Sequence, residues 1–148
     1  MEVIKYPYSK TQIWFYSIAF LAILIFLLVV FIVDFSDHST WPLLGMGGVF
    51  CGGALAYLYF KYFVHLQNGE IALELDKDKL QYFISNKSFF WKDVLYTSPG
   101  GNGRANGIRV RFSLENGSDI VINTQFIEGN DEEIYNTVME YCEKYKNV

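Results

Sequence analysis

Few of the side chains that usually perform catalysis or hold metals are present in this sequence of 148 residues. The histidines are His38 and His65, the cysteines are Cys51 and Cys142, and all four stand far apart in the chain. Their spacings match no zinc or redox motif. No serine or cysteine stands in the sequence context of a nucleophile elbow. We therefore expect no metal, no other cofactor and no catalytic activity.

A glycine-rich segment, residues 98–107 (SPGGNGRANG), has a composition that could serve ligand binding. Dense glycines can cradle a phosphate, and Arg104 could pair with one. The spacing, however, matches neither the dinucleotide fingerprint nor the P-loop. Gly, Asn and Pro are also typical of a flexible hairpin tip. We favour the flexible tip, which could order against a partner, over the phosphate cradle.

Further candidate contacts lie in two predicted strands. In a strand through Phe89, Phe90 and Trp91, Phe90 points opposite to the other two. Phe90 is then a core residue under a loop or bulge, which we favour slightly, or it touches the bilayer interface or a protein partner. We expect Arg109 and Arg111 to form a solvated strand face, and the alternative is contact with a phospholipid headgroup or an acidic partner. The candidate contacts to a partner or lipid are therefore Phe90, Trp91, Arg104, Arg109 and Arg111.

The charged residues are distributed very unevenly. Residues 1–60 contain five of them, and residues 61–148 contain the other 23. This break predicts an apolar region, residues 1–62, followed by a polar domain, residues 63–148. From residue 61 onward there are ten Lys or Arg against thirteen Asp or Glu. Such a domain lacks the basic surface that binding to nucleic acid or to anionic lipid requires.

Two uncharged segments, residues 13–33 and 41–60, are long enough to cross a bilayer as helices. The first would measure about 31 Å, which matches the hydrocarbon thickness of a bilayer. It is too long for the apolar part of a signal peptide, and no small-x-small cleavage site follows it. We therefore expect an uncleaved anchor with two transmembrane helices in contact with the lipid bilayer.

The second segment contains a stripe of small residues. Gly48, Gly52 and Ala56 recur every four residues, and small residues at this spacing let two helix backbones approach closely in lipid. We expect this stripe to be a helix-packing face. The first segment of the same chain is the expected partner, and a second copy of the protein is the alternative.

The flanking charges predict the orientation of the two helices. Lys5 and Lys10 precede the first segment and Lys61 follows the second, whereas the connecting loop has two acids and no Lys or Arg. Basic residues usually remain on the cytoplasmic side. We therefore predict a multi-pass protein of the cytoplasmic (inner) membrane with both termini in the cytoplasm.

The polar domain shows the patterns of strands followed by one helix. Apolar and polar residues alternate over residues 71–75, 80–84 and 108–115, and aromatic residues fill 88–98. Asn116-Gly117 predicts a type I′ hairpin turn, with residues 119–123 as the returning strand. Asn130 is a good N-cap, and the helix that follows has one apolar face, formed by Ile134, Val138, Tyr141, Cys142 and Tyr145.

The strands, the step Trp91-Lys92-Asp93-Val94, the hairpin and the terminal helix together resemble the bacterial pleckstrin-homology-like (PH-like) domains. Members of this group often follow two N-terminal membrane helices. The resemblance covers residues 70–146. It implies an α+β fold, namely an antiparallel sheet or half-barrel capped by a C-terminal amphipathic helix. It also implies a binding or scaffolding module and not a catalyst.

These observations lead to one main hypothesis for function. We expect an integral membrane scaffold or interaction protein that presents a cytoplasmic PH-like domain to a protein partner or to its own copies (a homo-oligomer), with no role in binding nucleic acid. The alternative is a toxin-immunity or envelope-stress protein that acts at the membrane. A third possibility, an enzyme acting on lipid, would need a polar cluster that the sequence does not show.

Overall fold

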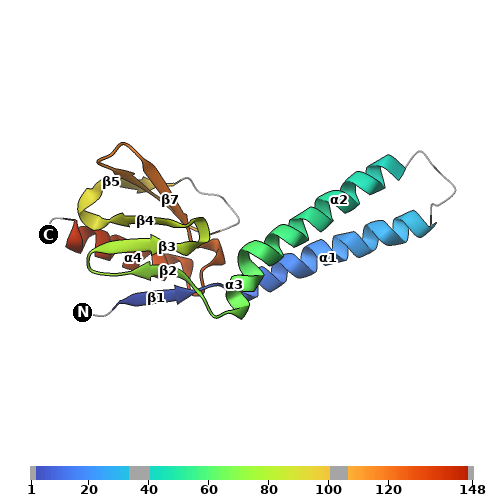
Figure 1. Cartoon of the computed structure of the whole chain (residues 1–148), viewed down its shortest axis with the longest axis horizontal. Helices are drawn as coiled ribbons and strands as arrows, with labels where there is room; N and C mark the ends of the chain where they lie inside the picture. Colours follow the sequence, from blue (N-terminus) through green and yellow to red (C-terminus); the bar gives the residue numbers. More distant parts are fainter. Residues whose placement is uncertain (1–2, 34–40, 101–106, 147–148) are drawn as a thin grey trace. The chain divides into compact units, whose positions relative to one another are not determined.

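The computed structural model describes residues 3–33, 41–100 and 107–146, and the chain divides into two compact units (Figure 1). One unit is a helical hairpin, Lys10–His65. The other is globular and combines Met1–Ser9 with Leu66–Val148. The sequence placed the first nine residues with the helices, whereas the structure groups them with the globular unit.

The helical unit contains two long apolar helices (Figure 1). Helix α1 spans Lys10–Val33, and a second run of 27 helical residues spans Trp41–Gln67. The second run consists of α2 (Trp41–Leu58), a π-helical segment η1 (Tyr59–Phe63) and α3 (Val64–Gln67). Both runs are long and apolar enough to cross a membrane. They include both segments predicted from the sequence.

The globular unit contains two antiparallel sheets. The first sheet has the order β1-β2-β3-β4, with β1 at Ile4–Pro7, β2 at Ile71–Leu75, β3 at Lys79–Tyr82 and β4 at Lys87–Phe90. The second has the order β5-β6-β7, with β5 at Val94–Pro99, β6 at Arg109–Leu114 and β7 at Asp119–Asn123. With helix α4 (Asp131–Tyr145), the unit is an α+β arrangement.

Strand β1 was not predicted, because four residues before a long apolar helix give no readable alternation. It pairs antiparallel with β2, so that Ile4 faces Leu75 and Tyr6 faces Leu73. Two further links extend the pairing beyond the strand: Tyr8 forms an isolated bridge with Ile127, and the Ser9 amide donates to the Phe126 carbonyl at 2.8 Å. The N-terminal segment is therefore an integral part of the globular unit.

The aromatic run expected as one strand over 88–98 is interrupted by a 3-10 turn, η3 (Trp91–Asp93). This turn carries the chain from β4 in the first sheet to β5 in the second. A second 3-10 turn, η2 (Phe83–Ser85), likewise ends the expected strand 80–84 early. Asn86 then reverses the chain in the left-handed conformation with φ of 52°, which Asn tolerates better than most residues.

The hairpin between β6 and β7 is present, but its turn differs from the prediction. Gly117 has φ of +78°, and its amide donates to the Leu114 carbonyl at 2.9 Å. A type I′ turn would also need a positive φ at Asn116, whereas Asn86 is the only described non-glycine residue with one. The prediction of a type I′ turn is therefore wrong. The Leu114 amide donates to the Ser118 carbonyl at 2.9 Å, so residues 115–117 form a three-residue loop with glycine at its left-handed position.

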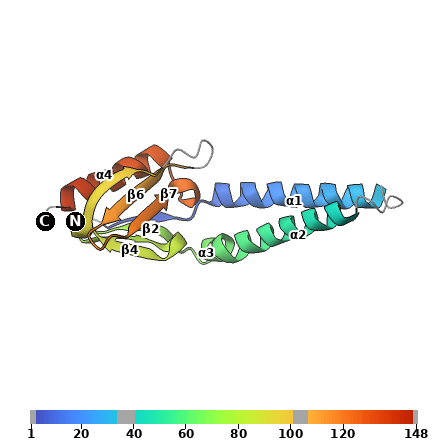
Figure 2. The same cartoon turned by 90° about the horizontal axis from the view of Figure 1, so that it is seen from above.

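Helix α4 begins as its sequence predicts. The Asn130 side chain accepts hydrogen bonds from the Glu132 and Glu133 amides at 2.9 and 3.4 Å. Ile134, Val138 and Cys142 are buried, as the expected apolar face requires. Figure 2 shows α4 along one side of the globular unit and β2 and β4 along the other.

Trp91 and Phe112 are the two largest fully buried side chains of the core. The Phe89 and Phe112 rings lie 4.9 Å apart between centroids, and the Trp91 ring lies 6.3 Å from that of Tyr141 in α4. Such aromatic contacts add to the burial of apolar area. The core therefore ties the two sheets and the helix together around Trp91.

Candidate interaction site

A surface hollow of about 440 Å³ lies where four parts of the globular unit meet. We call it the Phe90 hollow. The turn between β2 and β3 supplies Lys77 and Asp78, the end of β4 supplies Phe90, η3 supplies Lys92 and the end of α4 supplies Tyr145. Its lining thus combines two aromatic rings, two ammonium groups and one carboxylate.

Hydrogen bonds hold the turn that forms one wall of this hollow. The Trp91 indole Nε1 donates to the Asp76 carbonyl at 2.7 Å, and the Trp91 amide donates to the Asp78 carbonyl at 3.1 Å. The Asp76 amide in turn donates to the Lys79 carbonyl at 2.9 Å. Because the core residue Trp91 fixes the turn at two points, the wall of the hollow is preorganised.

Trp91 was predicted as a possible contact to a partner or lipid, and its burial excludes direct contact. Its side chain is 0% exposed, and its ring packs against Phe89 and Phe112. The Trp-x-Asp-aliphatic motif therefore marks a core tryptophan at a turn between sheets. Its effect on the surface is indirect and acts through the turn that it holds.

Phe90 has the opposite environment. It is 49% exposed, so the favoured interpretation of a covered core residue is wrong. The Lys92 ammonium lies 5.7 Å from the centroid of its ring, at the distance of a cation–π contact. Phe90 also lines a second hollow of about 240 Å³ with Lys79, Asp93 and neighbouring residues. The phenyl ring therefore stands between two depressions of the surface.

The lining of the Phe90 hollow has more ammonium groups than carboxylates. The Lys144 ammonium lies 5.7 Å from the Tyr145 ring, and the Lys146 ammonium donates to the Leu95 carbonyl. The one carboxylate of the lining, on Asp78, lies 3.8 Å from the Lys77 ammonium. The lining itself carries two ammonium groups and one carboxylate, whereas acidic residues outnumber basic ones over residues 61–148. The sequence does not reveal that these lysines are neighbours, because they come from three separate segments.

Two of the three predicted arginines, Arg109 and Arg111, do not join this hollow. Arg109 and Arg111 are exposed on the same face of β6, in the second sheet, and neither lines the Phe90 hollow. Both occupy the solvated strand face that the sequence favoured. Arg104 lies outside the described residues.

The glycine stripe of α2 does not make the expected contact with α1. A Cβ atom built on Gly48 or Gly52 would meet no other atom within 4 Å, and Ala56 is exposed. The close contact is at Gly47, whose Cβ would lie 3.1 Å from Leu27 of α1. The prediction that Gly48 and Gly52 pack on the first helix is therefore wrong. Their packing against a second copy of the protein stays a prediction.

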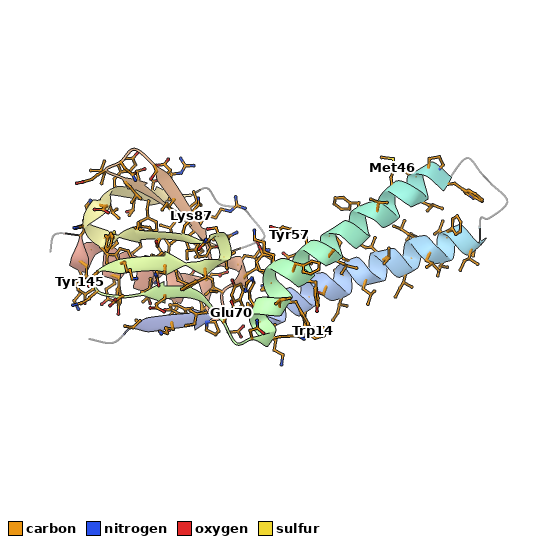
Figure 3. All side chains as sticks on the ribbon, viewed as in Figure 1. Trp14, Met46, Tyr57, Glu70, Lys87 and Tyr145 are labelled. Carbon is orange, nitrogen blue, oxygen red and sulfur yellow. The ribbon has the colours of Figure 1, made fainter. Side chains whose placement is uncertain are left out.

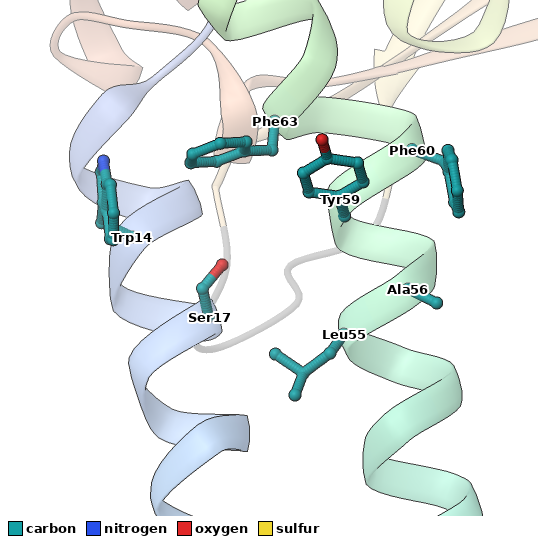
Figure 4. A pocket seen from close by; sticks show the side chains of 7 residues that line it. All are labelled: Trp14, Ser17, Leu55, Ala56, Tyr59, Phe60 and Phe63. Atoms are coloured by element: carbon teal, nitrogen blue, oxygen red, sulfur yellow. The ribbon is translucent and has the colours of Figure 1, made fainter.

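The helices leave an apolar hollow of about 490 Å³ between them (Figure 4). Trp14 and Ser17 line it from α1, and Leu55, Ala56, Tyr59, Phe60 and Phe63 line it from α2 and η1. The Ser17 hydroxyl donates to the Ile13 carbonyl of its own helix at 2.8 Å. This bond satisfies the hydroxyl within α1, so the hollow offers hydrocarbon and aromatic surface and little polar chemistry.

Three buried groups of the globular unit have a raised pKa. Burial raises the pKa of Tyr82 to about 12, and its hydroxyl donates to the Asn123 carbonyl at 3.0 Å. Burial also raises the pKa of Tyr8, with Glu70 adding to the effect, and that of the Cys142 thiol. All three groups favour their neutral form, which suits core residues more than acid–base catalysts.

Within the described ranges, no group of three or more His, Cys, Asp or Glu residues could hold a metal ion. Comparisons of the chain with protein-family models, with curated proteins and with solved structures found no match.

Proposed function

We propose that this chain is an integral membrane protein whose helical hairpin tethers a PH-like interaction domain to the cytoplasmic face of the membrane. The domain binds a protein partner or a second copy of the chain. One observation carries the membrane-tether part of this proposal: the strand before the first long helix pairs with the strand after the second.

That pairing sets a condition on how the helices cross a bilayer. Lys5 of β1 faces Glu74 of β2, and their side chains form a salt bridge at 3.4 Å. Two strands bonded in one sheet lie on the same side of a membrane. The two helices between them must therefore form a hairpin that enters and leaves on that side.

Exposure of the helices supports their location in lipid. The most apolar stretch of 18 residues in α1 contains no buried residue, unlike the core helix of a water-soluble protein. Phe15 and Phe26 are each 66% exposed. Leaving such side chains in water costs about 1.5–3 kcal/mol each compared with burial. A bilayer removes this cost.

The same sheet also argues that α1 is not cleaved from the protein as a signal sequence. If a peptidase removed α1 as a signal sequence, β1 would be lost with it, because β1 precedes α1 in the chain. The edge of the first sheet and the link from Ser9 to Phe126 would go too. The fold therefore supports an uncleaved anchor.

Lysine positions support the cytoplasmic side for the globular domain. Lys5 and Lys10 precede the hairpin, and Lys61 lies near its end. The Lys61 ammonium donates to the Tyr57 hydroxyl at 2.7 Å, an arrangement typical of aromatic and basic residues at a membrane surface. Basic residues at the ends of membrane helices favour the cytoplasmic side.

The arrangement of strands supports the PH-like assignment. Among the described residues, the six strands from β2 to β7 lie within residues 70–146, and β1 adds to the edge of the first sheet. A C-terminal helix follows, and its Tyr141 ring contacts Trp91 of the motif that suggested the resemblance. Such a domain serves binding or scaffolding.

Cysteine labelling tests the tether. In a background in which Cys51 and Cys142 are replaced by alanine, reporters are placed by His38→Cys in the loop between the helices and Lys87→Cys in the globular domain. A membrane-impermeant maleimide should label position 38 in spheroplasts and position 87 only in inside-out vesicles. Labelling of both positions from one side, or release of the protein by alkaline carbonate, would overturn the proposal.

Cross-linking tests the interaction. The intact protein in mild detergent or in cells should yield a discrete cross-linked species with one partner or with itself. A chain that stays monomeric and uncrosslinked at every concentration tested contradicts a role in interaction. The labelling experiment then still decides separately whether the protein spans the membrane.

A further inference from the structure

We propose that the Phe90 hollow binds an acidic peptide segment of a partner protein, with an apolar side chain of that segment against Phe90 and its carboxylates against the surrounding lysines. This inference rests on the proposed function and specifies the chemistry of the partner. It follows from the shape, the charge and the position of the hollow.

The shape suits a short peptide anchored by one large side chain. A volume of about 440 Å³ falls in the range of small-ligand sites. Phe90 is 49% exposed, and together with Tyr145 it supplies the two aromatic rings of the lining. Exposed aromatic side chains in preformed depressions are frequent anchors of protein interfaces. Since Trp91 already fixes the turn of residues 76–78, binding need not order that wall.

The charge of the lining favours a partner segment of negative charge. Lys77 and Lys92 line the hollow, and Lys144 stands beside Tyr145 at its edge. The opposing charge in the lining is the Asp78 carboxylate, which already faces Lys77. A site of positive charge on a domain with more acids than bases attracts acidic segments and repels basic ones. Flexible lysines also suit carboxylates whose positions vary along a peptide.

The hollow and the points where the chain enters and leaves the globular unit lie at different ends of the first sheet. Pro7 and Ile71 pair at the end of β1 and β2 where the chain passes to and from the helices. Ile4 and Leu75 pair at the other end, and the turn that carries Lys77 follows Leu75 directly. Strands of four and five residues separate the two ends by about 13–16 Å. Within the globular unit, the hollow thus lies at the end of the sheet opposite Pro7 and Ile71, where the chain passes to and from the helices.

Peptide binding to the full chain tests the inference. The protein is placed in nanodiscs of neutral phosphatidylcholine, and the probe is a fluorescein-labelled peptide of sequence Glu-Glu-Phe-Glu-Glu. Fluorescence anisotropy should show saturable binding that weakens as salt is added. A peptide in which lysine replaces glutamate should not bind. Replacing the central phenylalanine of the probe by glycine should weaken binding at least about tenfold.

Variants of the hollow and a matched control locate the binding. Lys77→Glu with Lys92→Glu should weaken binding at least about tenfold, and Phe90→Ala should have an effect of similar size. The control is Lys87→Glu, an exposed lysine at the other end of β4. Lys87 lies well apart from Tyr145 in the globular unit (Figure 3), so this variant should bind within about twofold of the parent. Unchanged thermal unfolding shows that each variant is folded.

Several outcomes would overturn the inference. These are absence of saturable binding, equal binding of the basic peptide, and equal loss with Lys87→Glu. Binding to separate phosphatidylglycerol vesicles without peptide binding, lost in the double variant, would assign the hollow to lipid. Self-association lost in the double variant would assign it to a second copy. If the peptide does not bind while positions 38 and 87 label from opposite sides, the proposed membrane tether is supported and the proposed ligand is excluded.

Discussion

The indole Nε1 of Trp91 donates a 2.7 Å hydrogen bond to the backbone carbonyl of Asp76, fifteen residues earlier in the chain. This bond joins the core to the turn between β2 and β3. The same turn forms a wall of the Phe90 hollow, so one buried side chain both fills the core and fixes a surface. Stability and binding are therefore coupled at Trp91.

Replacing Trp91 should separate the hydrogen bond from the packing. Trp91→Phe removes the donor and leaves the Asp76 carbonyl unpaired, which costs about 1–3 kcal/mol. Trp91→Ala also opens a cavity among Phe89 and Phe112 and should cost about 3–5 kcal/mol. Urea unfolding of the detergent-solubilised protein, followed by near-UV circular dichroism, measures both. Phe90→Ala at the adjacent exposed position should stay within about 0.5 kcal/mol. Equal losses for Phe90→Ala and Trp91→Ala would contradict the core assignment.

A cross-strand disulfide should join the segment before the helical hairpin to the segment after it. Lys5 and Glu74 are register partners on β1 and β2, within reach of a disulfide once both are cysteines. Mild oxidation of Lys5→Cys with Glu74→Cys, in the background without native cysteines, should close the bond. The chain is then cleaved at a protease site engineered between residues 34 and 40. On a non-reducing gel, the two fragments should migrate together if the disulfide has formed.

The matched control for that disulfide uses the next strand. Gln81 faces Glu74 from β3, so Lys5 and Gln81 are two strand spacings apart, about 10 Å. Lys5→Cys with Gln81→Cys should therefore stay reduced. Bond formation in the control pair, or none in the Lys5–Glu74 pair, would show that β1 does not add to the sheet beside β2.

Alkaline pH should destabilise the globular domain through Tyr82. Its pKa is raised from 10.0 to about 12 by burial, so the unfolded chain ionises first as pH rises. The stabilising contribution is complete below pH 10 and is lost progressively up to about pH 12, with a slope of up to about 1.4 kcal/mol per pH unit. Tyr8, whose pKa is also raised, adds in the same direction.

Tyr82→Phe provides the test of that assignment. The variant loses the hydrogen bond to the Asn123 carbonyl and so starts about 1 kcal/mol less stable. Its unfolding free energy should then fall less steeply between pH 10 and 12 than that of the parent. Parallel curves for parent and variant would mean that other groups cause the alkaline loss.

The elements that the sequence predicted well are those with local signals. Asn130 begins α4 because its side chain satisfies two amides within three residues of itself. The strand with Val110 and Phe112 is recognisable because its own alternation encodes one buried face. Both apolar helices are equally evident from composition and length. In each case the determining contacts or surfaces lie within the element itself.

What the sequence did not reveal depends on contacts between distant residues. β1 becomes a strand because β2, more than sixty residues later, pairs with it. The lysines of the Phe90 hollow come from a turn, a 3-10 segment and the end of a helix, and only the fold gathers them. Gly47 contacts α1 in place of Gly48 because the rotation of a helix depends on its partner.

The hairpin contact at Gly47 should respond to added volume. Gly47→Ile places its side chain against Leu27, where even a Cβ would lie at 3.1 Å, and should destabilise the hairpin by about 1–3 kcal/mol. Gly48→Ile with Gly52→Ile meets open space and should leave the contact between the helices intact. Thermal unfolding in detergent compares the variants. If the double variant alters only the oligomeric state, the stripe packs against a second copy.

Two glycines with similar backbone angles should differ sharply in their tolerance of alanine. Gly107 has φ of +81° and Gly117 has φ of +78°, so alanine is strained at either position, by about 1–2 kcal/mol. At Gly107 the new Cβ would also lie 2.5 Å from the Gln125 amide nitrogen, whereas at Gly117 it meets nothing within 4 Å. Gly107→Ala must therefore displace the backbone beside η4 (Thr124–Phe126) and should lose at least a further ~1–2 kcal/mol. Urea unfolding of the two variants under one condition measures the difference directly. Equal losses would mean that the chain at Gly107 does not approach Gln125 this closely.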